Sequence, residues 1–394
     1  MKILMVSNLY YPNIRGGAEE VVRTLAEKMV VEGNDVYILT LTDGADPHRE
    51  KINGVNVIRV PLRNVYWPSV DQESQALKPL WHLLDISNTA MLPTIKKILS
   101  DLSPDVIHTH AIAGFSPIVW KVAKDLDIPT IHTLHDHYLL CSRTAMYRGG
   151  RACESRCFDC SLFSIPKVWQ SRDLDTVVGV SKYILEIHQR FSGFPRAKQS
   201  VINNPIDSPL NASSRDIGTG RVRIGFIGSL YPQKGIHVVL DLCKKMKEYD
   251  FVIAGTGPEE IESQVKLGTA ENENLIYLGR SEKERFYSMI DILLVPSLWK
   301  ESASRVVIEA YSYGVPVIGS NLGGVAEFIQ DAETGYIVDP SREDDIVEKI
   351  NLIVSSRDVY KTFSYKALEY YAAYSVKDAA KEYLDEYKIL LEDR

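Results

Sequence analysis

Two glutamates bracket a short segment in the C-terminal half of the chain, in the sequence ESASRVVIE from Glu301 to Glu309. An unpaired carboxylate is costly to bury, so a glutamate two turns into a partly apolar helix needs a chemical reason. The small residues Ser302, Ala303 and Ser304 suit a helix start, and the free N–H groups of a first helical turn attract anions. Two carboxylates beside an anion site suit a ligand that carries both phosphate and hydroxyl groups, such as a nucleotide diphosphate sugar.

The elements that must position these glutamates follow an alternating strand and helix pattern, which occurs twice. Short apolar runs rich in valine, isoleucine and leucine are typical of parallel strands buried on both faces. We therefore expect an α/β fold with two Rossmann-like doubly wound domains in tandem. The expected strands lie at 2–7, 35–40, 105–110, 129–134 and 175–181 in the first set, and at 222–230, 250–257, 274–279, 291–297 and 315–320 in the second.

The boundary between the two domains falls in small and polar residues that have no apolar period. We expect a first domain at 1–207, a linker at 208–220 and a second domain at 221–375. The last segment, at about 376–394, has the apolar spacing of an amphipathic helix that packs back on the first domain. An extension of the second domain is the alternative. Ligands bind at the carboxyl ends of the strands in such sheets, so two facing domains would enclose a cleft.

Several motifs along the chain, in their order and spacing, resemble those of the retaining glycosyltransferases of family four. That family has the two-domain GT-B fold and a pair of glutamates separated by seven residues, and the resemblance covers nearly the whole chain. The glutamate pair is followed by YGVPVI at 313–318. The other matching motifs are GGAE at 16–19, TLHD at 133–136, GVSKY at 179–183, NNPID at 203–207, GSLYPQKG at 228–235, AGTGP at 254–258 and NLGGVAEFI at 321–329.

The resemblance implies a role for each matching residue. Glu309 would bind the ribose hydroxyls, Glu301 a hydroxyl of the donor sugar, and Lys234 the diphosphate. His135 would lie on the acceptor side, near the donor sugar. We therefore expect Glu301, His135 and Lys234 to serve catalysis. The expected substrate-binding residues are Gly16, Gly17, Ser229, Gly257, Arg280, Ser302, Ala303, Ser304, Arg305 and Glu309.

The chain departs from the family pattern at three positions. Ser229 stands where the family has an arginine, Ser304 where it has a glycine, and Arg305 where an apolar residue is more common. The first change removes a cation beside the diphosphate, and we expect Arg305 or Arg15 to replace it. A solvated arginine at a helix start is the alternative interpretation of Arg305. Because no acidic metal motif accompanies Lys234, we expect transfer without a metal cofactor.

The resemblance implies transfer of a sugar, a hexose by preference, to an acceptor hydroxyl with retention at the anomeric carbon. Retaining hydrolases place two carboxyl groups about 5 Å apart. Neither glutamate is evidently so placed, so we favour a front-face path in which the leaving diphosphate takes the acceptor proton. We expect a UDP-sugar donor, with a GDP-sugar as the alternative, and a lipid-linked or surface-polysaccharide acceptor. A nucleotide-sugar epimerase and a non-catalytic sugar-nucleotide-binding subunit are the alternative functions.

Four of the five cysteines fall in one window, at Cys141, Cys153, Cys157 and Cys160. Four thiolates at this spacing suit a structural zinc ion. Reduced thiols and a redox-labile disulfide are the alternatives, and the cytosol disfavours a lasting disulfide. We expect no metal at the histidines that lie on strand ends and turns of separate segments, which are His108, His110, His132, His135 and His137.

Composition and charge narrow the partners and the location. A net charge of −7 disfavours nucleic acid as a partner. Residues 1–200 carry 23 Lys and Arg against 21 Asp and Glu, so the first half is the one that can face an anionic membrane surface. Ordinary variation of a solvated surface is the alternative. Within this half, the arginine-rich segment 143–156 would meet a lipid-linked acceptor, and a solvated loop whose arginines balance the acidic second domain is the alternative. No signal peptide or membrane-spanning stretch is readable. We therefore expect a cytoplasmic protein that can be peripheral at the inner membrane face.

Overall fold

The computed structural model describes residues 1–67, 76–206, 214–218, 220–374 and 376–392. The chain forms two compact units. The first comprises residues 1–146, 154–205 and 376–394, and the second comprises residues 147–153 and 206–375.

Most of the expected linker at 208–220 lies outside the described residues. Its Arg215 is described and belongs to the second unit. The Arg215 guanidinium donates hydrogen bonds to the carbonyl oxygens of Tyr287 and Ile290 at 2.9 and 2.6 Å, and its backbone N–H donates to the Ser364 hydroxyl at 2.7 Å. This part of the expected linker is therefore fastened to the second unit.

An eight-stranded sheet forms the centre of the first unit, in the order β10-β9-β6-β5-β1-β2-β4-β3. All neighbours are parallel except the β3–β4 hairpin. The strand β1 is buried along nearly its whole length because neighbouring strands flank it on both sides, with Met5 opposite Ile38 and His108. The strands are β1 Lys2–Val6, β2 Asp35–Thr42, β3 His48–Ile52, β4 Val55–Pro61, β5 Val106–Thr109, β6 Thr130–Leu134, β9 Thr176–Gly179 and β10 Lys198–Val201.

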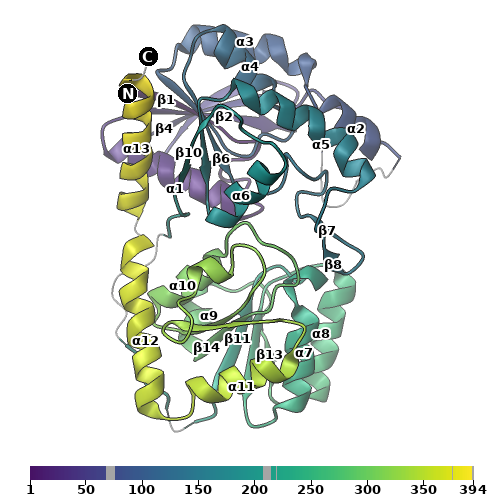
Figure 1. The fold of residues 1–394 in the computed structure, drawn as a ribbon, viewed down its shortest axis with the longest axis vertical. Coiled ribbons are helices and arrows are strands. Elements are labelled where there is room, and N and C mark those ends of the chain that lie inside the picture. The colour runs from purple at the N-terminus through teal and green to yellow at the C-terminus, as the bar shows by residue number, and fades with distance from the viewer. Residues whose placement is uncertain (68–75, 207–213, 219, 375, 393–394) are drawn as a thin grey trace. The chain divides into compact units, whose positions relative to one another are not determined.

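Helices cover both faces of this sheet (Figure 1). They are α1 Gly17–Val31, α2 Lys78–Leu84, α3 Leu92–Leu102, α4 Ile118–Asp125, α5 Phe158–Gln170, α6 Lys182–Arg190 and α13 Val376–Glu392. The last of them, α13, packs beside α1, and its Tyr383 and Tyr387 are buried in the same core as Ile3 and Val21. The amphipathic segment at the end of the chain thus packs on the first unit.

A six-stranded parallel sheet forms the centre of the second unit, in the order β13-β12-β11-β14-β15-β16. Alternate side chains of β14 enter two different cores, with Ile292 and Leu294 on one face and Leu293 and Val295 on the other. Such a strand must be apolar throughout. The strands are β11 Arg223–Ile227, β12 Asp250–Ala254, β13 Leu275–Tyr277, β14 Ile292–Val295, β15 Val317–Ser320 and β16 Gly335–Val338.

The helices of the second unit are α7 Ile236–Lys245, α8 Glu259–Glu271, α9 Lys283–Met289, α10 Arg305–Ser312, α11 Glu343–Ile353 and α12 Arg357–Tyr371. A short hairpin of β7 Tyr147–Arg148 and β8 Arg151–Ala152 completes the strands. The structure confirms the predicted α/β class, with two Rossmann-like units built on largely parallel sheets. Within the described ranges, no helix combines the length and apolarity needed to cross a bilayer.

Candidate active site

Both sheets have a topological switch point, where the chain order reverses and the loops after two adjacent strands diverge. In the second unit this point lies between β11 and β14, and in the first unit between β1 and β5. Ligands of open α/β sheets bind at the carboxyl ends of the strands at such a point. Lys234 follows β11, Glu301 follows β14, and Gly16 and Gly17 follow β1. The predicted residues His135, Gly257 and Arg280 follow β6, β12 and β13 instead.

In the second unit, the loops after β11 and β14 are held together by their backbones. The Leu298 N–H donates a hydrogen bond to the Gln233 carbonyl oxygen at 2.8 Å. Gly235 has a φ of +78°, and a Cβ there would lie 2.0 Å from the Pro296 carbonyl oxygen. Only glycine fits this close approach, which brings the start of α7 against the end of β14. The contact places the neighbouring Lys234 beside the glutamate that precedes α10.

Lys234 and Glu301 form an ion pair, with 2.9 Å between Lys234 Nζ and Glu301 Oε2. The Ser297 hydroxyl donates a hydrogen bond to the other carboxylate oxygen. The Glu301 side chain is 6% exposed, whereas that of Lys234 is 30% exposed. The Gly324 N–H donates to the Glu301 carbonyl oxygen at 2.7 Å and so fixes the backbone. These two residues therefore lie together, with the lysine open to a ligand.

Glu309 lies within α10 and is buried. Its Oε1 contacts Lys283 Nζ at 2.8 Å and Arg305 Nη2 at 3.7 Å. Its Oε2 accepts a hydrogen bond from the Tyr287 hydroxyl at 3.2 Å. Burial, followed by the charge of Glu309, raises the pKa of Tyr287 well above its usual value, so Tyr287 remains a hydrogen-bond donor at neutral pH. Arg305 thus faces Glu309, which contradicts the alternative of a fully solvated arginine.

Sequence analysis missed Lys283 and Tyr287, which both lie on α9. They are four residues apart and therefore share one face of the helix. That spacing was the available signal, but no pattern in the sequence indicates that this face meets α10. Only the packing of α9 against α10 reveals these two partners of Glu309.

Ser304 occupies the N-cap position of α10, as predicted, but its side chain does not cap the helix. Its Oγ is buried and has no hydrogen-bond partner among the described residues. Ser302 and Ala303 precede it and are half-buried. The predicted helix start is therefore confirmed, and the first turn of α10 receives no capping hydrogen bond from this hydroxyl.

The remaining predicted residues of the second unit surround the same strand ends. Ser229 follows β11 and is exposed, and Arg280 is exposed after Gly279. Gly257 donates its N–H to Glu262 Oε1 at 3.0 Å. A Cβ at Gly257 would lie 2.5 Å from a backbone oxygen of the loop after β11, so only glycine fits here. Gly257 therefore lies against the loop after β11, whereas Arg280 follows the edge strand β13.

In the first unit, the glycine pair begins α1. Gly16 and Gly17 are exposed, and the Gly16 N–H donates to Glu19 Oε2 at 2.9 Å. Arg15 precedes them and is also exposed. Because glycine has no side chain, Gly16 and Gly17 leave the start of α1 open to a ligand.

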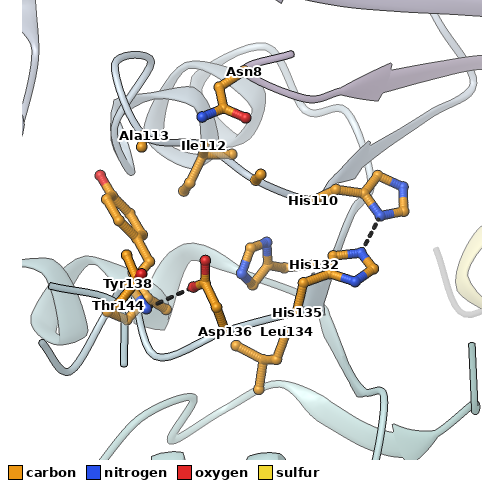
Figure 2. A pocket seen from close by; sticks show the side chains of 12 residues that line it. Asn8, His110, Ile112, Ala113, His132, Leu134, His135, Asp136, Tyr138 and Thr144 are labelled. Carbon is orange, nitrogen blue, oxygen red and sulfur yellow. Dashed lines mark hydrogen bonds between the residues drawn. The ribbon is translucent and has the colours of Figure 1, made fainter. Parts of the chain in front are cut away.

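A cavity of about 110 Å³ lies at the switch point of the first unit (Figure 2). Its polar lining comes from the ends of three strands. Asn8 follows β1, His110 follows β5, and His135, Asp136 and Tyr138 follow β6. The apolar part of the lining comprises Ala111, Ile112, Ala113, Leu134 and Leu139. We call this cavity the β1–β5 pocket.

The structure brings together histidines that the sequence places far apart. His110 Nδ1 lies 3.0 Å from His135 Nε2, and the rings of His108 and His110 are 3.9 Å apart between centroids. His108 also contacts the Tyr387 hydroxyl at 2.6 Å. Burial lowers the pKa of His108 and His110 well below 6.5 and that of His132 to about 3. In the described parts of the chain, no group of three or more His, Cys, Asp or Glu side chains is arranged to hold a metal ion.

Asp136 is the acidic member of the β1–β5 pocket. Its Oδ1 accepts a hydrogen bond from the Tyr138 N–H at 2.7 Å. Burial, opposed by this hydrogen bond, raises the pKa of Asp136 to about 6. Sequence analysis quoted Asp136 within its TLHD motif but assigned it no role.

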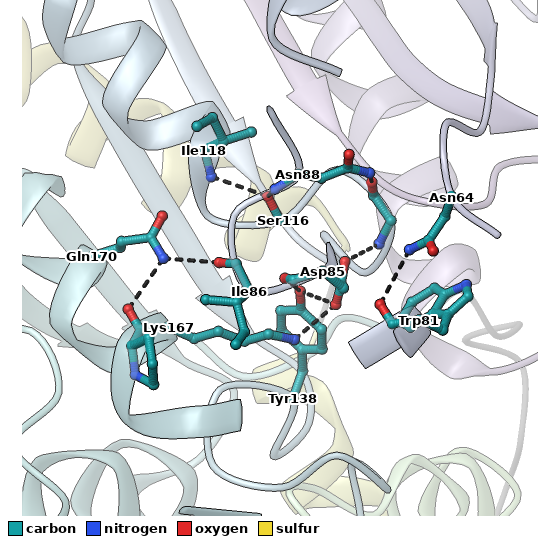
Figure 3. A network of polar contacts seen from close by, with 12 residues as sticks. Asn64, Trp81, Asp85, Ile86, Asn88, Ser116, Ile118, Tyr138, Lys167 and Gln170 are labelled. Carbon is teal, nitrogen blue, oxygen red and sulfur yellow. Dashed lines mark hydrogen bonds and ion pairs between the residues drawn. The ribbon is translucent and has the colours of Figure 1, made fainter. Parts of the chain in front are cut away.

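A buried polar network holds the wall of the pocket (Figure 3). Asp85 pairs with Lys167 at 2.7 Å and accepts hydrogen bonds from the Tyr138 hydroxyl at 2.6 Å and the Gly114 N–H at 2.7 Å. Lys167 Nζ also lies 3.7 Å from the centre of the Tyr138 ring. The network ties the loops after β5 and β6 to each other and so fixes the segment that carries Asp136.

The cysteine window has a buried thiol pair, Cys141 and Cys160, whose Sγ atoms are 3.6 Å apart. Contact with Cys160 and backbone N–H groups lowers the pKa of Cys141 to about 6, whereas contact with Cys141 raises that of Cys160. None of the five cysteines, all of which are described, forms a disulfide. Zinc at Cys141, Cys153, Cys157 and Cys160 stays a prediction.

Comparisons with known proteins agree with this architecture. The family model described as Glycosyltransferase Family 4 matches residues 15–208, and that described as Glycosyl transferases group 1 matches residues 209–370. An uncharacterized 42.6 kDa protein from the cps region of Klebsiella pneumoniae is 30% identical over 348 residues, which are 88% of this chain and 92% of that protein.

Solved structures share the fold over the whole chain. Sucrose-phosphate synthase from Thermosynechococcus elongatus has a TM-score of 0.77 at 19% identity and covers 100% of this chain and 99% of its own. HepE from Anabaena, solved in complex with UDP, has a TM-score of 0.72 at 17% identity and covers 98% and 99%. These likenesses show the GT-B fold.

Proposed function

Because the chain belongs to the group 1 glycosyltransferases of the GT-B fold, we propose that it transfers a hexose from a nucleotide diphosphate sugar to an acceptor hydroxyl, with retention at the anomeric carbon. The observation that carries this proposal is the pair of buried carboxylates at the switch point of the second unit. Glu301 and Glu309 each face a lysine, at 2.9 and 2.8 Å. UDP is the favoured nucleotide, since the similar HepE was solved with UDP, and GDP is the alternative.

The roles of the residues in this proposal are those that the family resemblance implies, and their positions support them. Lys234, half open beside the start of α7, binds the diphosphate, and Arg305 and the positive end of the α10 dipole supply further positive charge. Glu301 accepts a hydrogen bond from a donor-sugar hydroxyl, and Glu309 accepts those of the ribose. Positive groups aimed at the leaving diphosphate stabilise the charge that grows there in the transition state. The diphosphate then takes the acceptor proton, and no metal ion is needed.

Calorimetric titration with UDP tests the assignment of Glu309. A hydrogen bond to a charged group contributes about 1.5–3 kcal/mol, so Glu309→Gln should weaken UDP binding by roughly 10- to 100-fold. Glu271→Gln, an exposed position on α8, is the matched control and should bind UDP normally. Equal UDP affinity in a folded Glu309→Gln protein would remove Glu309 from the nucleotide site. Titration with GDP in parallel decides between the two bases.

We further propose that the acceptor is lipid-linked and is met at a membrane surface. The support is an apolar stripe on α5, formed by Phe158, Leu162, Ile165 and Trp169, whose exposed fractions are 87%, 57%, 54% and 59%. Their spacing of four, three and four residues places them on one face of the helix. The Arg172 guanidinium lies 3.8 Å from the centre of the Trp169 ring. An apolar stripe that ends in a tryptophan and a cation suits the boundary between lipid chains and anionic headgroups.

The stripe continues on the neighbouring helix α2. The rings of His82 and Phe163 are 5.6 Å apart, which places the two helices side by side. Leu80, Leu83 and Leu84 of α2 are also exposed. Together these residues make a larger apolar surface than single exposed side chains do, and such surfaces mark interaction sites.

Sedimentation with anionic liposomes tests this surface. Leu162→Glu with Trp169→Glu should abolish co-sedimentation, because two charges would enter the apolar layer. Leu267→Glu is the matched control, since Leu267 is 63% exposed on α8 of the second unit. Unchanged sedimentation of the double variant would exclude the α5 stripe. Arg143 is exposed and belongs to the arginine-rich segment that we expect to meet the acceptor at the membrane. Arg143→Glu is therefore a milder variant for the same experiment.

A further inference from the structure

We propose that His110 is a positioning residue, which donates a hydrogen bond from its Nδ1–H to Nε2 of His135 and so fixes the proton of the His135 ring on Nδ1. This inference rests on the proposed function, because the family resemblance assigns His135 to the reacting sugar. It goes further by naming the residue that orients His135 and the hydrogen-bonding role that this contact leaves to its imidazole.

The two rings meet at the ends of adjacent strands. β5 and β6 pair in parallel, and each of the two histidines directly follows its strand. His110 Nδ1 lies 3.0 Å from His135 Nε2, a contact that Figure 2 shows as a dashed line. Two imidazole nitrogens at this distance share one proton, so one ring donates the hydrogen bond and the other accepts it.

His110 is a neutral imidazole. Its side chain is buried and faces His108, with 3.9 Å between the two ring centroids. Burial, followed by the neighbouring histidines, lowers the pKa of His110 well below 6.5, so the ring carries no charge at pH 7. A neutral imidazole has one N–H and one lone pair. His110 is therefore either the donor to His135 or the acceptor from it.

The second nitrogen of His110 decides the direction of this bond. His110 Nε2 is buried and has no hydrogen-bond partner among the described residues. If His135 donated, the proton of His110 would lie on Nε2, and a buried N–H would have no acceptor. If His110 donates, only a lone pair is left unpaired, and an orphaned N–H is the rarer of the two in protein interiors. His110 is therefore the donor, and Nε2 of His135 accepts.

Buried contacts from the C-terminal helix hold His110 in this position. His108, which stacks on His110, is contacted at one nitrogen by the Tyr387 hydroxyl at 2.6 Å and at the other by the Thr133 hydroxyl at 2.7 Å. The Thr133 hydroxyl also lies 3.0 Å from the Tyr383 hydroxyl. Both tyrosines belong to α13 and are buried. The ring that supports His110 is therefore fixed, and the donor with it.

The direction of the bond limits what His135 can do. Its Nε2 lone pair accepts from His110, and its own proton lies on Nδ1, because the hydrogen bond at one ring nitrogen sets the proton on the other. The ring can then donate a hydrogen bond to an oxygen of the substrate, but it has no lone pair with which to take a proton. This agrees with the proposed transfer, in which the leaving diphosphate takes the acceptor proton.

NMR of the 15N-labelled histidine side chains measures where these protons lie. Protonated and unprotonated imidazole nitrogens have well-separated chemical shifts, and the signals of His135 are identified by their loss in His135→Gln. In the wild type at pH 7 we expect the His135 proton on Nδ1. A proton on Nε2 of His135, or on both of its nitrogens, would overturn the inference. The measurement needs neither a donor nor an acceptor substrate.

Three substitutions of His110 test whether it sets this proton. His110→Asn can place an amide N–H where Nδ1 lies, whereas His110→Gln places its amide near the position of Nε2 and His110→Phe keeps the ring without a donor. We expect the Nδ1–H form of His135 to persist in His110→Asn and to be lost in the other two. His48→Phe, at an exposed position of β3, is the matched control. An unchanged His135 spectrum in folded His110→Phe or His110→Gln would show that His110 does not set the proton.

Turnover of UDP-glucose, with octyl glucoside as the acceptor, tests the effect on the reaction. Loss of one hydrogen bond predicts a fall in kcat of about tenfold in His110→Phe, recovery in His110→Asn and an unchanged Kd for UDP. Equal kcat in His110→Phe and the wild type would remove His110 from the reaction. Equal UDP affinity in Glu309→Gln and the wild type would instead contradict the proposed function, whatever the position of the His135 proton.

Discussion

Each unit holds a lysine–carboxylate ion pair beside the carboxyl edge of its sheet, and the two pairs differ in exposure. Lys167 and Asp85 in the first unit are 2.7 Å apart with side chains 3% and 0% exposed, whereas Lys234 and Glu301 in the second are 2.9 Å apart and 30% and 6% exposed. Asp85 accepts hydrogen bonds from Tyr138 and Gly114 in addition to the ion pair. Lys167 and Asp85, the closed pair, therefore hold two loops together. Lys234 and Glu301 form the open pair, which leaves the lysine accessible to a ligand.

The same contrast extends to the pockets that the pairs support. The switch point of the second unit gathers cations around two carboxylates, which suits a diphosphate and the hydroxyls of a nucleotide sugar. That of the first unit has neutral imidazoles and one carboxylate with a raised pKa. The strand order places a ligand at the same point of both sheets. The chemistry of that ligand is decided by the side chains in the loops.

The largest effect should follow from opening the closed pair. Lys167→Met leaves Asp85 buried without its counter-ion, which costs about 3–5 kcal/mol of unfolding free energy. Urea denaturation, followed by circular dichroism, measures this loss. The double variant Asp85→Leu with Lys167→Met should recover much of it, because no charge remains buried. UDP affinity should stay normal in the folded protein, and a loss below about 1 kcal/mol would show that the pair is not structural.

Changing the open pair should affect the reaction more than the fold. Lys234→Ala removes a cation that faces the leaving diphosphate, so kcat should fall by about 10²- to 10³-fold. The stability loss should be smaller than for Lys167→Met, since the Ser297 hydroxyl still bonds Glu301. Steady-state kinetics and thermal melting are measured on the same samples. Lys266→Ala, an exposed lysine of α8, is the control, and a normal kcat for Lys234→Ala would place the diphosphate elsewhere.

The smallest effect should come from metal chelation. If protein cations alone balance the diphosphate, EDTA should leave the rate of transfer unchanged. Loss of activity that magnesium or manganese restores, with an intact circular dichroism spectrum, would show a metal at the donor site. Loss of the spectrum together with activity would instead indicate a structural metal at the cysteine window. The two outcomes separate the donor site from Cys141 and Cys160.

Much of the second site was readable from the sequence because it lies in short local segments. The spacing of Glu301 and Glu309 and the small residues between them predicted a helix start, and α10 begins at Arg305. The resemblance implied that Lys234 contacts the diphosphate, which stays a prediction, and the structure places Lys234 against Glu301. The sequence did not indicate that the Ser304 hydroxyl makes no capping hydrogen bond, since such a bond depends on the side-chain rotamer as well as on the residue type.

The sequence by itself determined the two α/β units, because buried parallel strands require apolar runs and their connections require helices. Its motifs, through their resemblance to the family, also indicated that Glu301, Glu309 and Lys234 belong to one site, and these residues lie in the loops and the helix that follow β11 and β14. Only the tertiary structure decided the partners that come from distant segments, such as Lys283 against Glu309 and Asp85 against Lys167. It alone also set the ionisation of Asp136, because a pKa depends on burial and on neighbouring charges that the local sequence does not specify.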